Sequence, residues 1–86
     1  MILEIISQSS KSTINVNWVE VNTYTGNFVI QAGHAPTIIS LEPEKELIFE
    51  HVDGEQERII IPSGIIHITR TCITLIISSN IPQQNS

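Results

Sequence analysis

The chain has 86 residues, which is enough for one small domain and too few for two. Four lysines and arginines against nine aspartates and glutamates give a net charge of -5, which excludes the basic surface that nucleic acid and anionic membranes require. No apolar run approaches the ~20 residues of a membrane-spanning helix, and no basic leader with an apolar stretch opens the chain. We therefore expect a soluble intracellular protein that does not insert into lipid.

Isoleucine dominates the apolar residues, and β-branched side chains favour a pleated, half-buried surface over a helix. Since no segment has an amphipathic helical period, the sequence predicts an all-β fold, a small two-sheet β-sandwich of about eight to ten strands. The domain is expected to cover residues 1–81, followed by a polar tail at 82–86. The predicted strands are 2–6, 12–16, 18–22, 28–30, 37–41, 47–52, 57–61, 65–68 and 72–78.

The loop before the fifth of these strands is predicted to be stiff and bent. Gly33 can adopt a positive φ, and Ala35 is pushed out of the helical region because Pro36 follows it. His34 is therefore held between two strands.

Asp53-Gly54 lies between two strand patterns and predicts a hairpin. A two-residue turn would place Glu50 opposite Glu57, a repulsive pair, whereas a three- or five-residue loop pairs Glu50 with Arg58. We expect this second register. Its predicted pairs are Glu50 with Arg58, Phe49 with Ile59 and Leu47 with Ile61.

In that hairpin the core face would carry Leu47, Phe49, Ile59 and Ile61, which leaves other apolar residues on the outer face. An outer strip of Ile48, Val52 and Ile60 would indicate a protein partner. The alternative is that both faces are buried inside a corner of the sandwich. In the last two strands, alternation predicts that the core residues are Ile66, Ile68, Ile73, Leu75 and Ile77.

Nothing in the sequence predicts catalysis. His34, His51 and His67 lack metal-ligand spacing, and Ser63-Gly64 lacks the G-x-S-x-G frame of a nucleophile and reads as a turn. The lone Cys72 suits a strand residue in a reducing compartment. There is no glycine-rich phosphate loop. We therefore expect no enzyme activity, no metal and no cofactor.

Residues 26–36, which end in Gly33-His34-Ala35-Pro36, resemble the G-x-F-G-I-x-x-G-H-A-P signature of the ε subunit of F-type ATP synthases, in its N-terminal β-sandwich domain. Residues 53–55 match the family's D-G-E, while 63–68 and 73–76 are similar to its S-G-G and V-T-V-L stretches. The resemblance covers roughly residues 1–80. Val29 and Ile65 replace two family glycines, so local loop shapes should differ while the fold is kept.

The resemblance implies a non-catalytic rotor subunit that docks on the γ subunit and the c-ring and helps to couple ion flow to rotation. Its place would be peripheral, at the cytoplasmic face of the inner membrane or the organellar equivalent. The c-ring contacts that the resemblance implies are Thr25, Gly26 and Asn27. For γ, our candidate contacts are His34, Ile39, Ile48 and Ile60, which belong to the outer strip and to the segment that begins at His34. Gly33, Pro36, Ser63 and Gly64 would be structural.

Family members usually continue into a helical hairpin, which this sequence lacks. Either the chain is a natural short form, which we expect, or it was cut from a longer one. Two other hypotheses stay open. The chain could be a free-standing β-sandwich adaptor for protein interactions, or a ligand-binding sandwich that uses the His34 loop.

Overall fold

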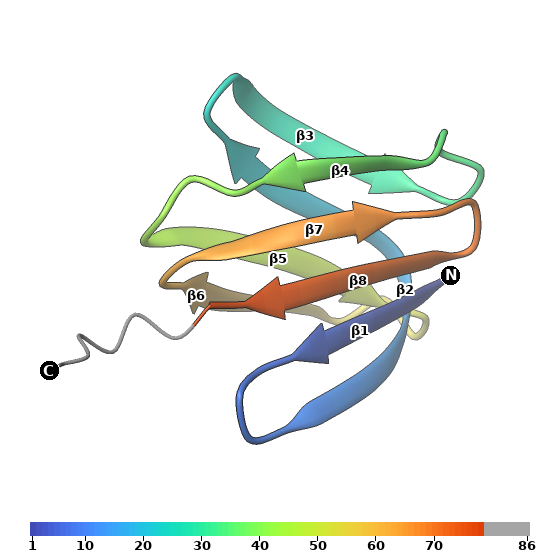
Figure 1. Ribbon diagram of the computed structural model, residues 1–86. Helices are drawn as coiled ribbons and strands as arrows, with labels where there is room; N and C mark the ends of the chain where they lie inside the picture. Colours follow the sequence, from blue (N-terminus) through green and yellow to red (C-terminus); the bar gives the residue numbers. More distant parts are fainter. Residues whose placement is uncertain (79–86) are drawn as a thin grey trace, which may run out of the picture.

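The computed structural model describes residues 1–78, which form eight strands and no helix (Figure 1). The predicted all-β fold is confirmed, whereas the predicted domain end at 81 and the tail at 82–86 lie outside these residues. The strands are β1 (Ile2–Ile6), β2 (Lys11–Thr23), β3 (Gly26–Gln31), β4 (Thr37–Ser40), β5 (Lys45–His51), β6 (Gln56–Ile61), β7 (Gly64–Ile68) and β8 (Cys72–Ile77).

The strands form two layers that share β2 (Figure 1). The front sheet has the order β4-β7-β8-β1 and ends on the first half of β2. The back sheet consists of β3, the second half of β2, β5 and β6. All neighbouring strands are antiparallel except β1 and β8, which run parallel.

The strand β2 is continuous where the sequence predicts two strands, 12–16 and 18–22. Its pairing with β5 shifts between Val16 and Trp18, so Asn17 is an extra residue in a β-bulge. The Asn17 side-chain amide donates to Glu50 Oε1 at 2.9 Å and to the His51 carbonyl at 3.1 Å. The extra residue exchanges the inward and outward positions, so Val16 is buried before the bulge and Val19 after it.

The core lies between the two sheets and is built from inward-facing aliphatic side chains. The predicted core faces of the last two strands and of the hairpin are confirmed, with Ile59 and Ile77 packed at the margin. The buried core residues are Leu3, Val16, Val19, Val21, Ile30, Leu41, Leu47, Phe49, Ile61, Ile66, Ile68, Ile73 and Leu75.

The predicted register of the β5–β6 hairpin is wrong, although its faces are right. Both registers keep the same alternation, because they differ by two positions in the pairing. Arg58 lies opposite Ile48 and reaches diagonally to Glu46, with Nη1 to Oε1 at 3.2 Å. The observed pairs are Glu50 with Gln56, Phe49 with Glu57 and Leu47 with Ile59.

The glycine position explains this register. The loop comprises residues 52–54, since His51 N donates to the Glu55 carbonyl at 2.7 Å and Gly54 N donates to the His51 carbonyl at 2.9 Å. Gly54 has φ of 97°, the left-handed conformation that the third position of such a loop requires. With a three-residue loop, the predicted pairing would have put Gly54 at the second position, where this conformation is not needed.

Gly64 allows close packing of β7 against β8. A Cβ built on Gly64 would lie 2.8 Å from the Ile76 carbonyl oxygen, a backbone atom that has little freedom to move. We expect Gly64→Ala to lower the free energy of unfolding by about 1–3 kcal/mol in urea denaturation. Ser63→Ala is the control and should change it by less than about 0.5 kcal/mol. An unchanged midpoint for Gly64→Ala would show that the backbone adapts.

Thr23 is a buried polar residue at the end of β2, with 4% of its surface exposed. Its Oγ1 donates to the Gly26 carbonyl at 3.0 Å and accepts from Thr25 N at 3.2 Å. We expect Thr23→Val to cost about 1–2 kcal/mol and to speed hydrogen exchange of the Thr25 amide. Thr23→Ser keeps the hydroxyl and should leave that exchange unchanged. Equal exchange in both variants contradicts the role given to Oγ1.

Candidate functional site

The outer face of the front sheet carries an apolar row that crosses three strands. Ile65 on β7 lies opposite Ile76 on β8, and Ile76 lies beside Ile6 on β1. Ile65 and Ile76 are 43% and 46% exposed. Their other direct neighbours on this face are apolar or uncharged. Such a contiguous apolar row on a solvent-facing sheet is typical of a surface that a partner covers.

Two further exposed isoleucines lie on the same face of the front sheet, outside this row. Ile38 on β4 is 69% exposed and lies opposite His67, while Ile2 on β1 is 40% exposed and lies beside Cys72. We call Ile2, Ile6, Ile38, Ile65 and Ile76 the front apolar face.

The charged side chains on this side of the molecule lie on β1 and on the first half of β2. Within the described residues, the charged side chains of the outer front sheet are Glu4 and Lys11, which form an ion pair at 3.5 Å. Glu4 also accepts a hydrogen bond from Thr74 Oγ1 at 3.4 Å. Ile65 and Ile76 can therefore be buried without burying an unpaired charge, whereas Ile6 lies opposite Lys11 and next to Glu4 on the same face of β1.

The outer face of the back sheet is polar by contrast. Glu46 pairs with Arg58, and Glu20 Oε2 accepts from the Asn27 amide at 3.0 Å. Ile48 is half-buried beside Arg58, and Ile60 is 58% exposed opposite Glu46. These two isoleucines stand among charged side chains and do not form a continuous apolar surface.

The residues predicted for γ contact lie in three different places. His34 is exposed in the loop between β3 and β4, Ile39 packs against the core, and Ile48 and Ile60 lie on the back sheet. The structure does not bring them together. The sequence analysis did not identify the front apolar face. The sequence does contain a signal for it, since strands with apolar inward residues also have isoleucine at outward positions.

The His34 loop is fixed from both sides. Gly33 has φ of 87°, as its position before the turn predicts, and its N–H donates to the Arg70 carbonyl in the β7–β8 loop at 2.9 Å. His34 Nδ1 lies 2.7 Å from the Ala35 carbonyl oxygen, so its ring contacts its own loop. Pro36 then leads into β4.

Residues 1–78 contain no pocket, no group of ligands that could hold a metal ion, and no helix with the length and hydropathy of a membrane span. The three histidines do not lie close together, and His51 Nε2 lies 2.8 Å from Glu57 Oε1. A partner of this part of the chain would therefore bind to its outer surface.

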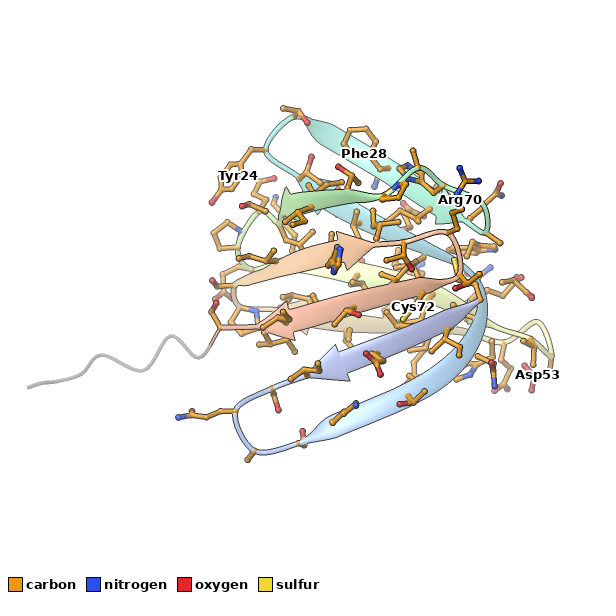
Figure 2. The ribbon with its side chains drawn as sticks, turned by 45° about the vertical axis from the view of Figure 1, so that its right-hand side comes forward. Tyr24, Phe28, Asp53, Arg70 and Cys72 are labelled. Atoms are coloured by element: carbon orange, nitrogen blue, oxygen red, sulfur yellow. The ribbon has the colours of Figure 1, made fainter. Side chains whose placement is uncertain are left out.

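Of the residues implied for c-ring contact, Thr25 lies in the turn between β2 and β3, and Gly26 and Asn27 begin β3. Thr25 and Gly26 are exposed, and Gly26 has φ of 139°. The Asn27 amide donates to Glu20 and to Asn22 Oδ1, the latter at 3.2 Å, so it lies along the outer face of the back sheet. Tyr24, 69% exposed, projects beside this turn (Figure 2).

Ser63 and Gly64 connect β6 to β7 at the same end of the sandwich as the β2–β3 turn (Figure 1). The Ser63 carbonyl accepts from Ser78 N at 2.9 Å, and the Gly64 carbonyl accepts from Leu41 N at 3.0 Å. This turn therefore links β4, β7 and β8, as a structural motif would.

Comparison with solved structures finds similar folds in two mitochondrial ATP synthases. One match is a chain from Euglena gracilis, in a structure of OSCP, F1 and the c-ring, with 22% identity and a TM-score of 0.80 over 90% of this chain. The other is from Tetrahymena thermophila, in a structure of the central stalk and c-ring, with 12% identity and a TM-score of 0.74 over 92% of this chain. The alignments span 49% and 63% of those chains.

Comparison with curated protein sequences gave no significant match. A family model described as the β-sandwich domain of the ATP synthase delta/epsilon chain matches residues 1–83. The match covers almost the whole sequence and agrees with the observed two-layer fold. The chain belongs to the family of ATP synthase delta/epsilon β-sandwich domains.

Proposed function

We propose that this chain is a non-catalytic rotor module of an F-type ATP synthase, which docks on the γ subunit and on the c-ring. One observation carries the proposal, the family match over residues 1–83. The fold of the two mitochondrial ATP synthase chains supports it, since both belong to structures that include the c-ring. As part of F1, the module would be peripheral to the membrane, at the cytoplasmic face of the inner membrane or its organellar equivalent.

The γ subunit is proposed to cover the front apolar face. Burying an exposed isoleucine stabilises a complex by roughly 1.5–3 kcal/mol when its whole side chain is removed from water. The row Ile65, Ile76 and Ile6 offers several such side chains without a charge between them. The outer face of the back sheet is polar and carries Glu20 and Glu46, so this face is proposed to stay exposed to water.

The turn that contains Thr25, Gly26 and Asn27 is proposed to rest on the c-ring. Its conformation is held by Thr23, and it lies at the end of long strands, so force at the turn is carried by the sheet. A rotor module needs this stiffness because a flexible link would store torque as strain. The Asn27 amide supplies no charge, so polar contacts and shape would dominate at this end.

The first prediction concerns γ binding. Ile65→Asp places a carboxylate at the centre of the front apolar face and should raise the Kd for γ by more than about tenfold, measured by titration calorimetry. Ile60→Asp is the matched control, because Ile60 is more exposed and lies on the back sheet. It should change the Kd by less than about twofold. The reverse result would place γ on the back sheet, around Ile48 and Ile60.

The second prediction concerns the c-ring. Asn27→Lys adds a charge at the turn, where exposed charges act mainly on association rate and salt dependence. We expect a changed association rate with detergent-solubilised c-ring that disappears at high salt, while γ binding stays within about twofold of wild type. Loss of γ binding together with c-ring binding would contradict the assignment of two separate surfaces.

A further inference from the structure

The strands β3 and β4 lie at the same edge of the sandwich, and within residues 1–78 each has one long pairing, β3 with β2 and β4 with β7 (Figure 1). An isolated bridge between Thr23 and Leu41 joins the two layers at one end of this edge. The rest of the edge is open to a further strand.

The direction of the peptide groups of β4 follows from one hydrogen bond. Leu41 N donates to the carbonyl of Gly64, which lies directly opposite it in the β4–β7 register. Antiparallel pairs alternate between bonded and non-bonded positions, so Ile39 bonds to β7 and Ile38 does not. The N–H and C=O of Ile38 therefore point to the open edge.

This edge lacks the charged residues that other edges of the molecule carry. The strands β3, Gly26–Gln31, and β4, Thr37–Ser40, contain no charged residue and no proline. By contrast, β6 carries Glu57 and Arg58, and β2 begins with Lys11. Exposed edges of natural sheets usually carry charges that prevent pairing with other chains, so an edge without them is suited to a partner strand.

The core is also incomplete at this edge. Phe28 pairs with Val21 on the inward side of β3, and Val21 is fully buried, yet Phe28 remains 42% exposed. The next inward residue of the same strand, Ile30, is fully buried. An aromatic ring on the inward side that stays half exposed indicates that a covering element is missing beside it (Figure 2).

We infer that the β3–β4 edge accepts an extended, uncharged segment of the γ subunit, which pairs with β4 at Ile38 and packs an apolar side chain on Phe28. This inference rests on the proposed function. We assign the γ subunit to this edge because Ile38 belongs both to the edge and to the front apolar face. A partner that covers the front apolar face therefore also contacts the edge. The segment is uncharged because neither strand offers a charge to pair with it.

The first test compares two adjacent residues of β3 that face opposite ways. Phe28→Ser removes the proposed inward contact, while Val29→Ser changes a 52% exposed side chain on the outer face. With γ as the titrant, the Kd should rise at least about tenfold for Phe28→Ser and less than about twofold for Val29→Ser. Equal effects of the two substitutions overturn the inference.

The second test uses wild-type protein, so it does not depend on the folding of a variant. Hydrogen exchange of the Ile38 amide, followed by NMR, should be at least about tenfold slower with γ bound than without it. If γ binds and this amide exchanges as before, the strand is not added and the inference fails while the proposed function stands. Protection that depends on protein concentration without γ would show pairing between copies of this chain and would overturn it. If wild-type protein does not bind γ, the proposed function fails as well.

Discussion

The fold depends on the bulge at Asn17, because it lets one strand belong to both sheets. Asn17 is held by hydrogen bonds to Glu50 and to the His51 backbone, both at the end of β5. The extra residue turns Val19 inward after Val16, so each half of β2 faces the same core from a different layer. The two sheets are thus covalently continuous, which stiffens a small domain, as the proposed rotor function requires.

The two layers present different chemistry to the outside. Outward positions of the front sheet carry isoleucines, and within residues 1–78 the charged side chains on this face are Glu4 and Lys11. The outer face of the back sheet carries Glu20, Glu46 and Arg58. A partner can therefore cover the front without burying unpaired charge, while the back stays hydrated. The family assignment and this difference between faces lead to the same proposal, a domain that a larger subunit covers on one side.

Alternating apolar residues were sufficient to predict the strands and their inward faces, as Ile66, Ile73 and Leu75 illustrate. The failures have local causes. The break predicted at Asn17 is a bulge, since a polar residue within an apolar alternation can be an extra residue as well as a strand end. The hairpin register is set by the loop position at which Gly54 has its positive φ. This requirement has a larger effect on the register than the favourable pairing of Glu50 with Arg58. The front apolar face could not be predicted, because solvent exposure is set by which strands become neighbours.

The central claim is that this domain is seated in a rotary ATP synthase by its front sheet. The most direct measurement is electron cryomicroscopy of the complex that copurifies with an affinity-tagged copy of this chain. The account predicts the sandwich beside γ, with Ile65 and Ile76 buried and the β2–β3 turn on the c-ring. A tagged protein that recovers no ATP synthase, or a bound sandwich with these isoleucines in solvent, would contradict it.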